Sequence, residues 1–260
     1  MASTKASSTS KKTSTKRPAA KAPSKAKGSA KTAGAAAGRA SSKAKASSKA
    51  KGASKPSALD VEMLAAATRG DLAEVASLLD RGANVRAQDG RTGASALHEA
   101  AATGTIPLVK LLIERGADLE AEKRNAQTTA LGVAVMAGRF PVVKVLLQAS
   151  ARHDRPFERS GWHCLHAAVS SGEPEMVEAL LAAGADVHAR TRAGQTPLAQ
   201  AVRLGADPSE AKKVGAIILL LRRAGADPKA EVFDGESTLD IADTLGRDHL
   251  KPFLTQPVSK

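Results

Sequence analysis

The chain of 260 residues has a formal net charge of +13, and this charge is unevenly distributed along it. Residues 1–56 contain 15 of the 39 Lys and Arg side chains and no acidic one, whereas the remaining residues have a net charge of −2. The single cysteine excludes an intrachain disulfide, and the longest strongly apolar run, Ala216 to Leu221, is too short to cross a membrane.

Residues 1–56 form a segment of a different kind from the rest of the chain. They use only eight amino-acid types and include no Leu, Ile, Val or aromatic residue. A segment without these side chains buries too little apolar surface to offset the entropy that is lost on ordering. We therefore expect a disordered basic arm at residues 1–56, followed by a folded domain at residues 57–260.

The charge of the arm indicates a polyanionic partner, because Lys and Arg side chains bind nucleic-acid phosphates by releasing counterions, without reading bases. Its "KAK" and "SSKAKASSKAK" runs resemble the tails of linker histones and of bacterial lysine- and alanine-rich nucleoid proteins. The candidate nucleic-acid-binding residues are Lys11, Lys12, Lys16, Arg17, Lys21, Lys25, Lys27, Lys43, Lys45, Lys49 and Lys51. A solubilising tail, contact with an anionic membrane surface and a cleaved organellar transit segment are the alternatives.

Three columns of residues recur six times in the rest of the chain. The first column is apolar and consists of Met63, Leu97, Leu131, Leu165, Leu198 and Leu239. The second is alanine, at Ala66, Ala100, Ala134, Ala168, Ala201 and Ala242. The third is glycine, at Gly70, Gly104, Gly138, Gly172, Gly205 and Gly246. This recurrence predicts repeated units, each of which buries its apolar face against its neighbours.

Each unit is predicted to form a short helix, a glycine turn, a longer helix and an extended loop. The longer helix has apolar residues at helical spacing, as in "IPLVKLLIERG" and "FPVVKVLLQAS". Pro107 and Pro141 stand where this helix begins, a position that tolerates proline. The residues expected to end it in a left-handed conformation are Gly116, Gly184 and Gly225, with Ser150 at the same position in the third unit.

These features together resemble the ankyrin repeat over about residues 58–255. The ankyrin signature T-P-L-H-x-A appears as "TPLAQA" from Thr196, as "SALHEA" from Ser95 and as "HCLHAA" from His163. The resemblance implies an all-α repeat solenoid of about six stacked helix-turn-helix units with hairpin-like loops. The approximate bounds of these units are 57–88, 89–122, 123–156, 157–190, 191–231 and 232–260.

The stretch from Ser160 to Gly172 contains the only Trp, the only Cys and two of the six His residues of the chain. These residue types could bind a metal ion or form a thiol nucleophile with its base. However, His166 and His98 occupy the ankyrin histidine position, where the resemblance implies hydrogen bonds within and between repeats. We therefore interpret this stretch as scaffold. Three units are expected to lose this hydrogen bond because they have other residues there, namely Gly132, Ala199 and Asp240.

Residues 206–213 form an insertion before the second helix of the fifth unit. Asp207, Pro208 and Glu210 match an N-cap residue, a first-turn proline and a capping-box acid. We therefore expect this helix to begin about two turns early. Two roles are open for the insertion, the stabilisation of a late unit and the presentation of a ridge to a partner.

The resemblance implies that protein partners bind on a concave face, formed by the loop tips and the ends of the first helices. The candidate protein-binding residues are Trp162, Phe157, Met136, Arg124, Arg159, Arg192 and Arg203. Trp162 is either an exposed contact residue or a ring that packs on the scaffold. The equivalent residues Ala94, Thr128, Gln195 and Glu236 are small or polar, which favours exposure. The loop arginines are alternatively ordinary solvated charge, since acidic residues lie among them.

The sequence contains no phosphate-binding loop, dinucleotide fingerprint, paired-cysteine zinc spacing or HExxH motif. We therefore expect no enzyme activity, cofactor, metal or small-molecule substrate. The leading hypothesis is an ankyrin adaptor or regulator that binds an unidentified protein and is held on nucleic acid by its arm, in the cytoplasm, nucleoid or nucleus. The alternative is a linker-histone-like DNA-condensing protein whose repeats serve recruitment or oligomerisation.

Overall fold

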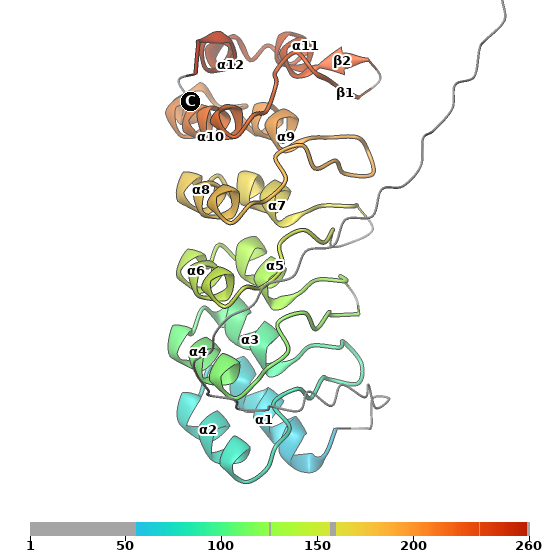
Figure 1. The fold of residues 1–260 in the computed structure, drawn as a ribbon, viewed down its shortest axis with the longest axis vertical. Coiled ribbons are helices and arrows are strands. Elements are labelled where there is room, and N and C mark those ends of the chain that lie inside the picture. The colour runs from blue at the N-terminus through green and yellow to red at the C-terminus, as the bar shows by residue number, and fades with distance from the viewer. Residues whose placement is uncertain (1–55, 125, 157–159, 234, 259–260) are drawn as a thin grey trace, which may run out of the picture. The chain divides into compact units, whose positions relative to one another are not determined.

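The computed structural model describes residues 56–258 apart from residues 125, 157–159 and 234, and these residues lie in one compact unit. The predicted arm falls almost entirely outside them. In the described part of the chain, six pairs of α-helices follow one another (Figure 1). The pairs are α1 (Ala58–Arg69) and α2 (Leu72–Asp80), α3 (Ala96–Thr103) and α4 (Ile106–Glu114), α5 (Ala130–Met136) and α6 (Phe140–Gln148), α7 (Cys164–Ser171) and α8 (Pro174–Ala182), α9 (Pro197–Leu204) and α10 (Ala211–Arg223), and α11 (Thr238–Thr244) and α12 (Lys251–Thr255). The all-α repeat solenoid is confirmed.

The first helix of each pair lies in one column of the stack, which we call the inner column (Figure 1). Each helix of this column packs against the next one, from α1 to α11. The six alanines of the second sequence column are at most 1% exposed, because they lie where these helices meet. Their methyl groups let the helix axes approach closely, and the first-column residues are buried beside them, except for the half-buried Leu239.

The second helix of each pair forms the outer column. These helices bury the apolar positions that the helical spacing predicts, for example Val109 and Leu112 in α4. Pro107 and Pro141 lie in the first turns of α4 and α6, as expected. Within the described residues, none of the helices combines the length and apolar character needed to cross a membrane.

The insertion lengthens the fifth pair as predicted, although its first turn differs from the expectation. The Asp207 side chain accepts a hydrogen bond from the Ser209 amide, and a 3₁₀ turn, η1 (Pro208–Glu210), leads directly into α10. The capping box expected from Glu210 does not form, because a 3₁₀ turn places the backbone amides differently from an α-helical turn. The chain nevertheless remains helical from Pro208 to Arg223.

The last unit closes the stack by close contacts with glycines. It begins with a short antiparallel pair, β1 (Glu231–Phe233) and β2 (Glu236–Ser237), and includes a 3₁₀ turn, η2 (Asp248–Leu250). A Cβ atom at Gly215 of α10 would lie 2.6 Å from the Phe253 ring, and one at Gly205 would collide with Leu250. Gly205 has a φ of −70°, so close packing, and not left-handed backbone, requires glycine at this member of the third column.

The position that ends each outer helix yields a first prediction. Gly184 and Gly225 have φ values of 92° and 108° there, and Ser150 has a φ of 65° at the equivalent position. A side chain in this region costs about 1–2 kcal/mol, part of which is offset because glycine loses more entropy on folding. Ser150→Gly should therefore raise the free energy of unfolding by about 0.5 kcal/mol.

The reverse change, Gly184→Ser, is the matched control and should lower the free energy of unfolding by a similar amount. Urea denaturation of both variants measures the effect. A destabilised Ser150→Gly protein would contradict the assignment of strain to Ser150.

Candidate protein-binding surface

The stretch from Ser160 to Gly172 is built as scaffold. Cys164 is 2% exposed, and burial raises the pKa of its thiol to about 12. A thiol with so high a pKa is not ionised at neutral pH and is a poor nucleophile. Among the described residues, no three His, Cys, Asp or Glu side chains lie close enough together to hold a metal ion.

The two histidines at the signature position join neighbouring units. The Nδ1 atom of His98 accepts a hydrogen bond from the Ser95 amide at 3.1 Å, and Nε2 lies 3.0 Å from the Thr128 carbonyl oxygen of the next unit. His166 repeats this arrangement with the amide of His163 at 3.4 Å and the carbonyl of Gln195 at 3.0 Å. Because the amide donates and the carbonyl accepts, each ring is the neutral tautomer with its proton on Nε2.

Four units lack this histidine, with Leu64, Gly132, Ala199 and Asp240 in its place, and they differ from one another. Gly132 and Ala199 have no side chain that could make the bond, as expected. The expectation was wrong in part for Asp240, because its Oδ2 accepts a hydrogen bond from the Ser237 amide at 2.8 Å. The carboxylate thus replaces the Nδ1 contact of the histidine, but within the described residues it makes no hydrogen bond to another unit.

Trp162 is half-buried, so its ring packs on the scaffold and also keeps part of its surface in solvent. Its side chain packs against the hydrophobic core, and its ring centroid lies 6.4 Å from that of His166. The equivalent residues range from the buried Ala94 and Thr128 to the exposed Glu236, so small or polar residues in this column do not by themselves indicate exposure. Two further candidate protein-binding residues, Phe157 and Arg159, fall outside the described residues.

The loop residues Arg124 and Arg192 occupy equivalent places between units. The Arg124 amide donates to the Thr92 carbonyl at 2.8 Å, and the Arg192 amide donates to the Ser160 carbonyl at 2.9 Å. The Arg124 guanidinium also donates to the Gly90 carbonyl at 2.7 Å. Each residue therefore joins its loop to the preceding one, while its side chain remains exposed to solvent.

Met136 and Arg203 belong to a row of residues that follow the buried alanines by two positions on the inner helices. We call this set the inner row, and its members are Thr68, Ala102, Met136, Ser170, Arg203 and Thr244. All six are exposed or half-buried, and stacking of the inner helices brings them into one line. Met136 is 46% exposed, which makes it one of few large apolar side chains that the described surface presents to solvent.

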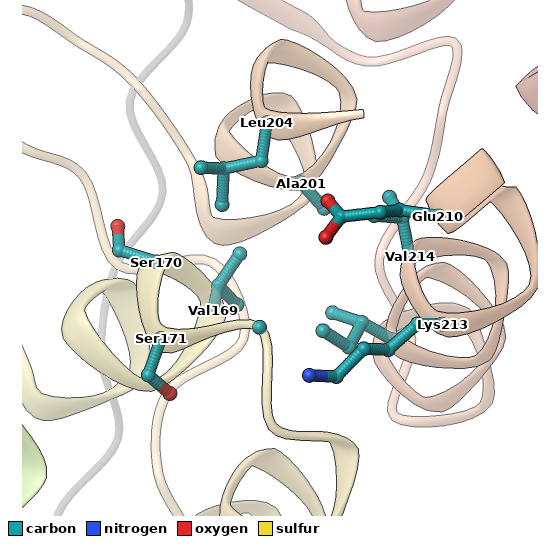
Figure 2. A pocket seen from close by; sticks show the side chains of 10 residues that line it. Val169, Ser170, Ser171, Ala201, Leu204, Glu210, Lys213 and Val214 are labelled. Carbon is teal, nitrogen blue, oxygen red and sulfur yellow. The ribbon is translucent and has the colours of Figure 1, made fainter. Parts of the chain in front are cut away.

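A cavity lies between the fourth and fifth pairs, and no motif in the sequence directly indicates it. It has a volume of about 230 Å³ and is lined by residues of α7, α9, η1 and α10, including Leu204, Glu210 and Lys213 (Figure 2). The insertion at residues 206–213 supplies one of its walls. An insertion in an otherwise regular repeat was therefore the only available signal for it.

Comparisons with known proteins agree with this architecture. Residues 63–157 match the family model described as "Ankyrin repeats (3 copies)", and residues 160–192 match the model described as "Ankyrin repeat". The chain contains ankyrin repeats. The fifth and sixth units lie beyond these matches, but α9 to α12 continue the same two columns. No curated protein matches the chain significantly.

A solved structure is similar to this ankyrin domain. It is described as the Bd0816 predatory endopeptidase from Bdellovibrio bacteriovorus in complex with immunity protein Bd3460. The matching chain is 28% identical, with a TM-score of 0.64, and the similarity covers 75% of the present chain and 98% of the other. The similar chain is thus one that was solved in a complex between two proteins.

The ankyrin histidines yield a prediction for pH dependence. Burial lowers the pKa of both His98 and His166 to about 4 from the ordinary 6.5. The unfolded chain therefore binds more protons between pH 6.5 and pH 4, so stability is present above pH 6.5 and is lost as the pH falls through this window. Between pH 7 and pH 5 each histidine should account for a loss of about 2 kcal/mol in the free energy of unfolding.

Urea denaturation at pH 7 and pH 5 tests this prediction. His98→Asn should be less stable than the parent at pH 7 but should lose about 2 kcal/mol less on acidification. His188→Asn is the control, because His188 is exposed to solvent. Equal acid sensitivity of His98→Asn and the parent would show that other groups cause the loss.

Proposed function

We propose that this protein is a non-enzymatic adaptor or regulator, and that the inner face of its ankyrin domain binds another protein. The observation that carries the proposal is the inner row, a line of small or polar residues with the exposed Met136 among them. Small side chains leave room for a partner to approach the inner helices, and an exposed large apolar residue gives it surface to bury. The complex in which the similar chain was solved supports a protein partner.

The chemistry of the buried groups also supports a role in binding. Cys164 is protonated and inaccessible, and both ring nitrogens of His98 and His166 are occupied by backbone groups. These three groups are therefore used structurally, and not as a nucleophile or an acid–base catalyst.

A narrower candidate rests on the solved neighbour, which is part of a complex between an endopeptidase and an immunity protein. According to this candidate function, the inner face would bind a peptidase and inhibit it. Capture of a peptidase by the ankyrin domain, together with its inhibition, would favour this candidate over a general adaptor.

Affinity capture with paired variants tests the proposal. Met136→Arg places a charge in the inner row and should weaken partner binding by about tenfold or more. Leu72→Arg is the matched control, because Leu72 is a similarly exposed apolar residue (38%) on the outer helix α2. Captured proteins are identified and their affinities measured for the parent and both variants.

The proposal requires that Leu72→Arg keep the partner that Met136→Arg loses, with unchanged melting temperatures. Equal capture by all three proteins would place recognition elsewhere on the molecule. In that case Trp162 and the loop arginines become the next residues to replace.

We further propose that the arm at residues 1–56 binds nucleic acid without sequence preference. Its 15 positive charges and complete lack of acidic residues support this role. The arm has no aromatic residues, so stacking on the bases of single strands is not expected.

Salt dependence tests this second proposal. Full-length protein should bind duplexes of unrelated sequence with similar affinity, and if about 8 phosphates are engaged, the logarithm of affinity should fall by about 7 per decade of salt. Residues 57–260 are the control and should bind negligibly, since their net charge is −2.

Equal DNA binding by residues 57–260 would move the site onto the ankyrin domain. Strong DNA binding by the full chain without any captured protein would favour the alternative of a DNA-condensing protein.

A further inference from the structure

The cavity between the fourth and fifth pairs is specific to the place where the chain departs from regular repeat spacing. It is lined by the buried aliphatic side chains of Val169, Val214 and Ile217 and by the half-buried Leu204. Glu210 of η1 and Lys213 of α10 extend into it from the side of Val214, across from Val169 and Leu204 (Figure 2). Aliphatic side chains beside charged groups suit an occupant with an apolar stem and a charged end.

The charges at the mouth of the cavity are not balanced. The Lys213 ammonium lies 3.4 Å from the Glu173 carboxylate, so these two groups neutralise each other. The Glu210 side chain is exposed and forms no ion pair with the described residues. The mouth therefore has a net charge of about −1, which favours a positively charged group.

The size of the cavity fits one long side chain. A volume of about 230 Å³ holds roughly seven groups of the size of a water molecule, at about 30 Å³ each. The side chains of lysine and arginine have roughly this number of non-hydrogen atoms or slightly fewer, and their methylene stems pack well on apolar surface.

We propose that this cavity binds one lysine or arginine side chain of the protein partner, with its stem against Leu204 and Val214 and its cationic end at Glu210. The inference rests on the proposed protein-binding function and extends it to the chemistry of one contact. The cavity adjoins the inner row, because Ser170 lines it, so one partner can reach both.

Other occupants fit this site less well. An acidic side chain would face the unpaired carboxylate of Glu210 and would find Lys213 already paired with Glu173. A purely apolar side chain would displace water from the Glu210 carboxylate without providing hydrogen bonds in its place. This loss of hydrogen bonds costs free energy.

Small fragments that mimic the three classes of side chain test the proposal on the full-length protein. The probes are n-butylguanidinium, n-butyrate and n-butanol, and the readout is the shift of methyl NMR signals from Leu204, Val214 and Ile217. Butylguanidinium should bind with a dissociation constant of roughly millimolar order, which is typical for so few atoms. Butanol should bind more weakly, and butyrate should not shift these methyl signals.

The variant Glu210→Gln removes the unpaired charge with little change in volume. It should weaken butylguanidinium binding about two- to fivefold, the range expected for one exposed charge pair. Glu178→Gln is the matched control, because Glu178 is an exposed carboxylate of α8 that does not line the cavity. Melting temperatures establish that both variants are folded.

Three results would overturn the proposal: no methyl shift with butylguanidinium, equal or tighter binding of butyrate, and unchanged binding by Glu210→Gln. None of them depends on the partner, so failure of this inference is distinguishable from failure of the proposed function. Capture of a partner through Met136 tests the proposed function, whereas the fragment experiments test the cavity proposal.

Discussion

The close approach of the inner helices is the constraint on which the rest of the structure depends. It requires a residue no larger than alanine at one position of every unit, and alanine is present there in all six, at most 1% exposed. A larger side chain at this position would force neighbouring units apart and would cost about 1–3 kcal/mol. The spacing that the alanines set also brings the His98 ring within hydrogen-bond reach of the next unit, at 3.0 Å from the Thr128 carbonyl.

Stacking leaves carbonyl groups at helix ends and in loops, and side chains of adjacent units satisfy many of them. Arg86 donates to the Gly116 carbonyl at 2.9 Å, and Arg139 donates to the Ala102 carbonyl at 3.0 Å. His153 makes the equivalent contact with Ala183 at 2.9 Å. Residues of these types dominate many binding surfaces, but here they hold units together. These side chains are therefore part of the scaffold, and the binding surface that we propose is the inner row.

The architecture could be predicted from the sequence because it follows from periodic constraints. Columns of leucine, alanine and glycine report packing that repeats in every unit, so six examples support each inference. Features that occur once were harder to predict. The burial of Trp162 depends on a single loop, and the carboxylate of Asp240 replaces a histidine by local geometry. The cavity beside Glu210 is lined in part by residues of the insertion, which no column of the repeat describes.

The contact between Phe253 and Gly215 matters for the order in which the domain comes apart. In a linear stack whose units touch mainly their neighbours, opening begins at an end and advances one unit at a time. At the C-terminal end, α12 is held on α10 by this contact and by Arg222, whose guanidinium donates to the Phe253 and Gln256 carbonyls at 2.8 Å. The contacts of α12, a helix of only five residues, thus determine whether local unfolding stops at the sixth unit or continues into the fifth unit. The fifth unit is less densely packed, because the cavity lies beside it.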